Sequence, residues 1–173
     1  MSQPAVSQYL ASLRAHGDAV FVNPEWLPRR DRLPATYASC YSSRFTDQEA
    51  WYRIDAVSAQ VDDLNERDPQ LVWSGDVAAD RLRPWKVPIT AIVYGSIPAE
   101  LMDEFGFVRA DSAATASVLV RPFPDDRFAD EVEHLDGLRL APRLHLIADL
   151  MGLGGDDRIE AASRLAEQES SSA

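Results

Sequence analysis

The chain has 173 residues, of which 46% are hydrophobic, and a net charge of −11. A chain of this length suits one domain and buries roughly 70% of its unfolded surface on folding, so we expect a sizeable hydrophobic core. The sequence excludes a membrane-spanning run, a secretory signal peptide and, because Cys40 is its only cysteine, an intrachain disulfide. We therefore expect a cytoplasmic protein.

Basic and acidic residues are divided unevenly along the chain. Residues 1–45 contain five arginines and three acidic residues, whereas residues 46–173 contain twelve basic and twenty-five acidic residues. Because an acidic body repels nucleic-acid phosphates, we expect DNA contact only from the N-terminal part. The candidate contacts are Arg29, Arg30 and Arg32. The favoured interpretation of this Pro- and Arg-rich segment (residues 24–34) is a solvated, extended connector, since its basic residues do not alternate with aromatic ones, and nucleic-acid contact is the alternative.

Three segments are predicted: an N-terminal arm (1–45), an α/β domain (46–168) and a disordered tail (169–173). In the arm, residues 5–15 have apolar side chains at helical spacing, and residues 19–22 form a short strand candidate. A helix followed by a short β element resembles the end of a winged helix-turn-helix. Too few residues precede it for the complete three-helix module, so we interpret the arm as a remnant or a docking segment.

The longest helix is predicted for residues 45–67, where Thr46 and Glu49 match a capping box. Its apolar stripe, which includes Val57 and Val61, is expected to face the core. Oligomerisation through this helix is the alternative.

Residues 71–96 combine the strongest local signals of the chain. A short apolar run is followed by a helical pattern over residues 76–83, a turn containing two prolines, and the most strand-like run of the sequence. Because strand, helix and strand follow one another closely, the two strands are predicted to lie parallel. Ser74 is predicted to cap the helix through its side chain, and Gly75 to permit the tight exit from the strand.

The C-terminal half alternates short helices and strands. The predicted elements are helices over 98–105, 142–153 and 157–168, a helical turn over 128–133, and strands over 107–109, 116–121 and 138–140. We therefore expect a mixed α/β fold, with a small mixed sheet of four to six strands covered by helices and a two-helix C-terminal element.

No catalytic, metal-binding or cofactor-binding set is predicted. Gly95-Ser96 after a strand matches the phosphate turn of nucleotidyltransferases, but the Asp-x-Asp pair that would bind Mg²⁺ does not follow on a strand. The three histidines lack metal-ligand spacing. A nucleotide-binding or nucleotidyltransferase-like protein that uses this turn remains the enzymatic alternative.

Two separated motifs resemble a known family. SGDVAADRL (residues 74–82) with the following Pro-containing turn and strand, and RLHLIADLMGLGGDDRIEAASRL (residues 143–165), resemble in content and order the AbiEi-type antitoxins of type IV toxin–antitoxin systems. The resemblance covers about residues 46–168. The matching positions are Ser74, Gly75, Ala78, Ala79, Asp149, Gly154, Gly155, Arg158 and Glu160.

The residues themselves indicate structural roles for these positions. The alanines would allow their helix to lie close to the sheet, and Arg158 could reach Asp149 or Asp157 across the glycine turn.

The resemblance implies a non-enzymatic bacterial protein of an abortive-infection, phage-defence system, with an α/β antitoxin domain and a role in transcriptional regulation. In that family a winged helix-turn-helix usually precedes the domain and represses the operon. The candidate partners are a cognate nucleotidyltransferase toxin, opposed without a stable complex, DNA reached through the arm or a partner, and a second copy of the chain. A structural or oligomerisation module is the third hypothesis.

Overall fold

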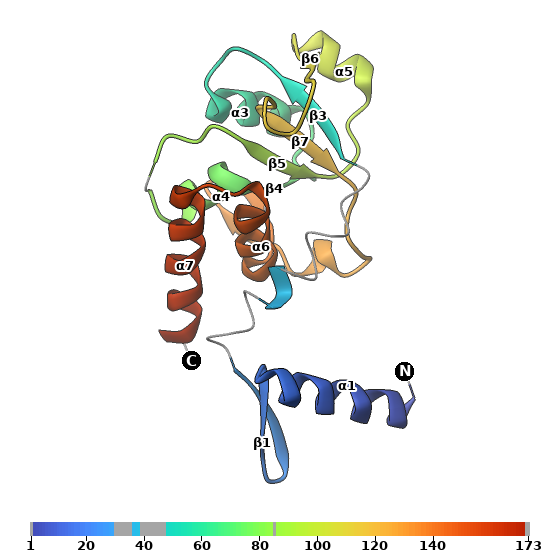
Figure 1. Ribbon diagram of the computed structural model, residues 1–173. Coiled ribbons are helices and arrows are strands. Elements are labelled where there is room, and N and C mark those ends of the chain that lie inside the picture. Colours follow the sequence, from blue (N-terminus) through green and yellow to red (C-terminus); the bar gives the residue numbers. More distant parts are fainter. Residues whose placement is uncertain (1, 30–35, 39–47, 85, 172–173) are drawn as a thin grey trace.

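The computed structural model describes residues 2–29, 36–38, 48–84 and 86–171 (Figure 1). The elements are α1 (Gln3–His16), β1 (Ala19–Val22), β2 (Glu25–Pro28), β3 (Glu49–Tyr52), α3 (Val57–Arg67), β4 (Val72–Ser74), α4 (Gly75–Leu82), β5 (Ala91–Tyr94), α5 (Ala99–Glu104), β6 (Val108–Arg109), β7 (Val118–Arg121), η2 (Phe128–Asp130), β8 (Glu133–Leu135), β9 (Leu138–Leu140), α6 (Arg143–Leu153) and α7 (Asp156–Ser171). The mixed α/β class and the two-helix C-terminal element are as predicted.

A seven-stranded mixed sheet forms the centre of the body, in the order β6-β3-β7-β5-β4-β9-β8. The pairs β5–β7 and β4–β9 are parallel and the remaining neighbours are antiparallel. The sheet is larger than the predicted four to six strands because β3 comes from the segment predicted to be helical and β8 was not predicted.

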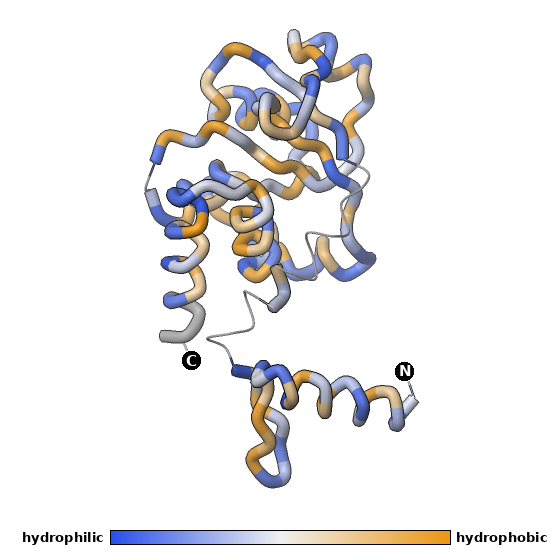
Figure 2. Tube along the Cα trace, in the orientation of Figure 1, coloured by the Kyte–Doolittle hydropathy of each residue, from blue (hydrophilic) through white to orange (hydrophobic). Residues whose placement is uncertain are grey.

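Alternate residues of the central strands pack on opposite faces of the sheet, as the period of a strand requires. Trp73 and Val93 belong to the larger cluster, together with α3, α4 and the C-terminal helices, whereas Val72 and Ile92 belong to a second cluster that includes Phe128 of η2. The hydropathy of the chain follows this arrangement, with hydrophobic residues along the central strands (Figure 2). The core is therefore divided by the sheet into two layers.

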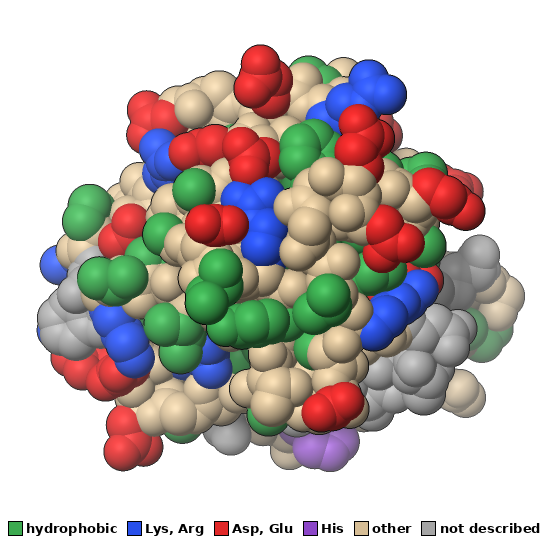
Figure 3. All heavy atoms as spheres, turned by 90° about the horizontal axis from the view of Figure 1, so that it is seen from above, with side chains coloured by type: hydrophobic (Ala, Val, Ile, Leu, Met, Phe, Trp, Pro, Cys, Tyr) green, Lys and Arg blue, Asp and Glu red, His purple; other side chains and the backbone are tan. Residues whose placement is uncertain are grey.

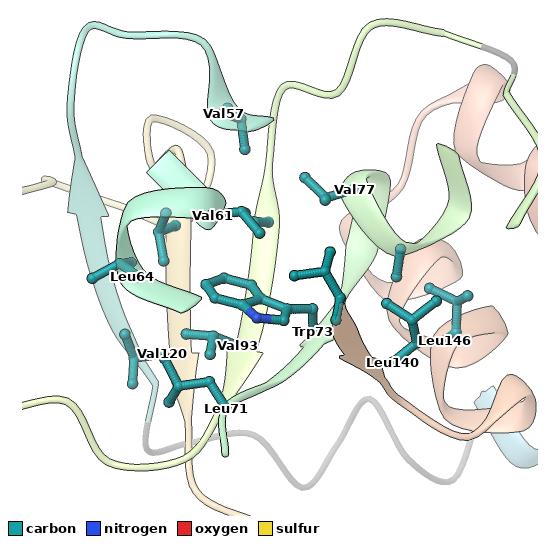
Figure 4. Packing of buried hydrophobic residues seen from close by; sticks show 14 of the residues in the cluster. Val57, Val61, Leu64, Leu71, Trp73, Val77, Val93, Val120, Leu140 and Leu146 are labelled. Carbon is teal, nitrogen blue, oxygen red and sulfur yellow. The ribbon is translucent and has the colours of Figure 1, made fainter. Parts of the chain in front are cut away.

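Trp73 is the centre of the larger cluster. Its side chain is fully buried, and it lies between the α3 side chains Val61 and Leu64 and those of the sheet (Figure 4). The indole Nε1 donates a hydrogen bond to Asn65 Oδ1 at 3.2 Å, so the polar edge of the ring is also satisfied. The packing of Val61 confirms that the apolar stripe of α3 faces the core.

The pairing of β4 and β5 corrects the parallel arrangement predicted for residues 71–96. The two strands are adjacent and antiparallel, with Trp73 opposite Val93, and a further bridge joins Gly75 to Ala91. After the eight-residue α4, the chain returns to pair with the strand that it left. Helix α4 and residues 83–90 are therefore an insertion between two antiparallel strands.

The helix predicted from residue 45 begins only at Val57. Residues 49–52 instead form β3, which pairs with β6 and β7, and Ile54 between β3 and α3 is exposed. Trp51 and Ile54 are spaced as on one face of a helix, but pairing with the neighbouring strands determines the structure of residues 49–52. Of the predicted capping box, Glu49 lies in β3 and Thr46 lies outside the described residues.

The arm consists of α1 and a two-stranded antiparallel hairpin, β1–β2, which lie apart from the body in Figure 1. The hairpin corrects the prediction that residues 24–28 belong to an extended connector. Residues 36–38 form a helical turn. Thr36 Oγ1 donates to Asp18 Oδ1 at 2.9 Å, and Tyr37 contacts His145 of α6, so this helical turn touches both the arm and the body.

At the other end, α7 continues to Ser171, into the segment predicted to be a disordered tail. Among the described residues, no helix combines the length and the apolar character needed to cross a membrane.

Candidate functional site: the cleft between α4 and α7

The two sequence motifs meet in space through Arg158 and Asp76. Arg158 at the start of α7 donates from Nε to Asp76 Oδ1 at 2.7 Å and from Nη2 to Asp76 Oδ2 at 2.9 Å, a bidentate pair. Both side chains are mostly buried. The predicted partners of Arg158, Asp149 and Asp157, are therefore not its hydrogen-bond partners. Planar guanidinium and carboxylate groups match in two bonds, which fixes α7 against α4.

Asp76 also holds the chain segment that returns to β5. Its Oδ2 accepts the backbone N–H groups of Ile89 at 3.3 Å and Thr90 at 3.1 Å, and Arg158 Nη2 donates to Thr90 Oγ1 at 3.0 Å. The hydrogen bond with Asp76 is the main cause that raises the pKa of Arg158. One carboxylate thus joins α4, α7 and the start of β5.

A cleft opens beside this ion pair, between α4 and α7, and Arg83, Lys86 and Val87 also line it. We call it the α4–α7 cleft. Its volume is about 40 Å³, and both charged and apolar residues line it. The apolar lining residues are Ala79, Val87, Leu150, Ala161 and Leu165.

The charges that line the α4–α7 cleft are largely paired. Lys86 Nζ lies 2.5 Å from Asp157 Oδ2, and Arg164 Nη2 lies 2.6 Å from Glu160 Oε1. The hydrogen bond from Lys86 is also the main cause that lowers the pKa of Asp157. Arg83 lines the cleft as well, is exposed and forms no ion pair within the described part of the chain.

Beneath this site, a buried polar cluster surrounds Asp149 of α6. Its carboxylate accepts bonds from Ser74 Oγ at 2.5 Å, from Tyr94 Oη at 2.9 Å and from Arg121 Nη1 at 2.6 Å. The predicted capping role of Ser74 is wrong, because its hydroxyl makes no cap bond and donates to Asp149 instead. The cluster ties α6 to three neighbouring strands.

Asp149 and Arg121 form a fully buried ion pair. Burial raises the pKa of Asp149, and the charge of Arg121 with the Ser74 and Tyr94 hydroxyls opposes that rise. Gln48 Oε1 accepts a further bond from Arg121 Nε at 3.0 Å. The cluster is therefore internally satisfied, which indicates a structural role.

A second pocket, of about 340 Å³, lies near the other end of α6 and is lined by Asp125, Phe128 and His145 among others. Tyr37 Oη and His145 Nε2 are 2.6 Å apart, and the ring of Phe128 meets that of His145 edge to face. Burial lowers the pKa of His145 to about 4, so the imidazole is neutral at pH 7.

The remaining motif positions have backbone and packing roles. Gly75 has φ +72°, and a Cβ there would lie 3.1 Å from the Thr90 carbonyl oxygen, so only glycine fits without strain. Ala78 and Ala79 are buried in the larger cluster, which confirms the predicted close packing of α4. Gly154 and Gly155 have φ +71° and +93° and form the turn between α6 and α7.

The candidate nucleic-acid contacts lie in or beside the arm. Arg29 follows β2, is exposed, and its backbone N–H donates to the Asp18 carbonyl at 2.7 Å. Arg30 and Arg32 lie outside the described residues. The DNA interpretation therefore depends on α1 and the hairpin beside Arg29.

Gly95 and Ser96 end β5, as the phosphate-turn alternative requires. The Gly95 N–H donates to the Arg121 carbonyl at 2.9 Å, and a Cβ on Gly95 would lie 2.9 Å from the Leu71 side chain. Across the described ranges, no three His, Cys, Asp or Glu side chains are grouped so that they could hold a metal ion.

No protein-family model matches the chain, and neither the curated proteins nor the solved structures contain a significant match.

Sequence reasoning missed Asp76, Tyr94 and Arg121. Asp76 follows Ser-Gly at the start of a helix. The helix dipole alone explains a carboxylate there, so the sequence does not indicate a distant partner. Arg121 ends an otherwise apolar strand and is buried, which is a signal that a buried acidic partner exists. Nothing in the sequence identifies that partner as Asp149.

Proposed function

We propose that this protein is a non-enzymatic, antitoxin-like regulator of a type IV toxin–antitoxin system, acting in phage defence in the bacterial cytoplasm. The observation that carries the proposal is the contact between the two motifs. The segments that resemble the AbiEi-type antitoxins, far apart in sequence, are joined by the Asp76–Arg158 pair and by the Ser74–Asp149 bond.

The contact supports the resemblance because independent helix patterns would have no reason to be complementary. The positions that match the family are also those that the fold uses: Gly75 at a strained turn and Ala78 against the sheet. Among the described residues, the buried ionic cluster is satisfied by its own members, as expected for a scaffold rather than a reacting centre.

The arm supports a DNA-binding contribution. It pairs a helix with an antiparallel β-hairpin, the two elements that read a groove and its flanking backbone in winged helices. No residue of α1 is buried, its side chains include Ser7, Gln8, Ser12 and Arg14, and it carries no acidic residue. The acidic body is unsuited to phosphate, so DNA would contact the arm.

Two experiments test the proposal together. The first is co-expression with a nucleotidyltransferase toxin, if the neighbouring gene encodes one; growth should recover in the presence of the wild-type protein. The second is a mobility shift with DNA from upstream of the gene, in which Arg14→Glu should weaken binding about tenfold or more and lower the salt dependence. Arg127→Glu, an exposed arginine of the body, is the matched control. Absence of both rescue and DNA binding would refute the proposal.

A further inference from the structure

We propose that the α4–α7 cleft is a docking site for a partner protein, which inserts one aliphatic side chain into the cleft and places a neighbouring carboxylate at its mouth. This interaction is separate from DNA contact by the arm, and goes beyond the proposed regulatory function.

The size of the cleft favours a protein side chain over a small molecule. Its volume is about 40 Å³. Pockets for drug-sized ligands or cofactors usually enclose about 300–1,000 Å³, an order of magnitude more. The walls formed by Ala79, Ala161 and Leu165 are apolar, so the group that fits is an aliphatic side chain.

The apolar surface continues beyond the cleft. Val87 forms part of its lining and is nevertheless 78% exposed, and Ile89 in the same segment is 53% exposed. The backbone N–H groups of Ile89 and Thr90 donate to Asp76, so Ile89, two residues after Val87, is presented on a fixed backbone. A single inserted side chain would leave them uncovered, whereas a peptide segment covers them.

The charges specify the neighbour of that side chain. Asp76 is neutralised by Arg158 and Asp157 by Lys86. Arg83 also lines the cleft and, within the described residues, forms no ion pair. Its guanidinium can donate two hydrogen bonds to one carboxylate without breaking an existing pair. Figure 3 shows hydrophobic side chains lying among charged ones on one face of the molecule.

The occupant is therefore a segment with an aliphatic residue close to an Asp or Glu. In such a segment the aliphatic side chain in the pocket provides most of the affinity. The charged neighbour at the rim fixes the orientation of the segment.

The test is selection from a displayed library of random 12-residue peptides on the full-length protein. Recovered peptides should share an aliphatic residue within two positions of an acidic one. Synthetic copies should bind Val87→Glu and Arg83→Glu at least about tenfold more weakly in fluorescence anisotropy. Val108→Glu, at a 59% exposed position on β6, is the matched control and should bind like the wild type.

Three results would overturn the proposal: no enrichment relative to selection on Val87→Glu, recovered peptides that lack the acidic residue, or peptides that bind both cleft variants as tightly as the wild type. An affinity for N-acetyl-leucine equal to that for the selected peptides would assign the cleft to a small molecule. A dimer that dissociates in Val87→Glu would assign it to a second copy. DNA binding by the arm should be unchanged in both variants, so failure here is distinguishable from failure of the regulatory proposal.

Discussion

Arg158 and Asp76 lie 82 residues apart in the chain and are joined by two charge-assisted hydrogen bonds of 2.7 and 2.9 Å. Their side chains are shielded from solvent. Because Asp76 also receives two backbone N–H groups, this pair connects the C-terminal helix to the β4–β5 insertion. Its removal should affect both.

Arg158→Leu should destabilise the fold by about 1–3 kcal/mol, because Asp76 remains shielded and keeps only its backbone donors. Urea unfolding followed by circular dichroism measures the change. Arg164→Leu is the control; it breaks the exposed pair with Glu160 and should change stability by no more than about 0.5 kcal/mol. Equal effects of the two substitutions would contradict the prediction.

Asp149→Leu should be more severe, at about 3–5 kcal/mol, because it leaves the Arg121 guanidinium buried without its counter-charge. Adding Arg121→Met removes that charge and should restore most of the loss. A double variant no more stable than the single one would mean that the hydroxyl bonds, rather than the charge pair, dominate. Chemical denaturation of the four proteins in the cycle provides the answer.

Gly75→Ala should destabilise the protein by about 1–3 kcal/mol, since alanine disfavours the positive φ and its Cβ would crowd the Thr90 carbonyl. Gly152 in α6 is the matched control: a Cβ there meets no atom within 4 Å. Gly152→Ala should stabilise by about 0.5–1 kcal/mol through helix propensity. The two changes in melting temperature should have opposite signs.

Acid should weaken the fold partly through His145. The pKa of its imidazole falls from 6.5 to about 4 on folding, so the unfolded chain binds the proton more readily between those values. Stability should therefore decline as the pH falls from about 6.5 towards 4. His145→Gln should flatten this part of the profile, whereas His134→Gln, at an exposed position on β8, should leave it unchanged. Urea midpoints measured across this range decide the matter, and an unaltered slope in His145→Gln would refute it.

Val61→Glu distinguishes a core face from an oligomer interface. Val61 of α3 is fully buried, so an ionised carboxylate there should destabilise the monomer by more than about 3 kcal/mol. Ile54→Glu, at a position 87% exposed, should change stability by no more than about 0.5 kcal/mol. Light scattering with denaturation tests both, and a folded Val61→Glu protein with only a changed mass would favour the interface.

Local sequence patterns correctly predicted the elements whose ends carry proline or glycine. The strand β9 has the predicted bounds, with Gly137 before it and Ala141-Pro142 after it. The C-terminal helices were predicted for the same reason, from a proline at one end and glycines between them. In these places the backbone has few alternatives, and the neighbouring residues suffice.

Other features depended on partners distant in the chain. The apolar residues of segment 49–57 suit helical spacing, yet β3 forms because β6 and β7 lie on either side of it. Likewise, the sequence around Ser74 is typical of an N-cap. In the structure its hydroxyl instead donates a hydrogen bond to the buried carboxylate of Asp149, 75 residues further along the chain. The family resemblance identified Asp149 as a motif residue. Its hydrogen-bond partners could be identified only from the folded structure.

The antiparallel pairing of β4 and β5 separates the residues that fix the sheet from the residues that shape the cleft. Since Gly75 pairs with Ala91, the ends of segment 76–90 are fixed by the sheet itself, whatever the residues between them. Substitutions at Arg83 or Val87 can then alter the shape and charge of the cleft while the strand register stays constant. Related chains could exchange one binding preference for another on an unchanged framework, much as variable loops do on rigid scaffolds.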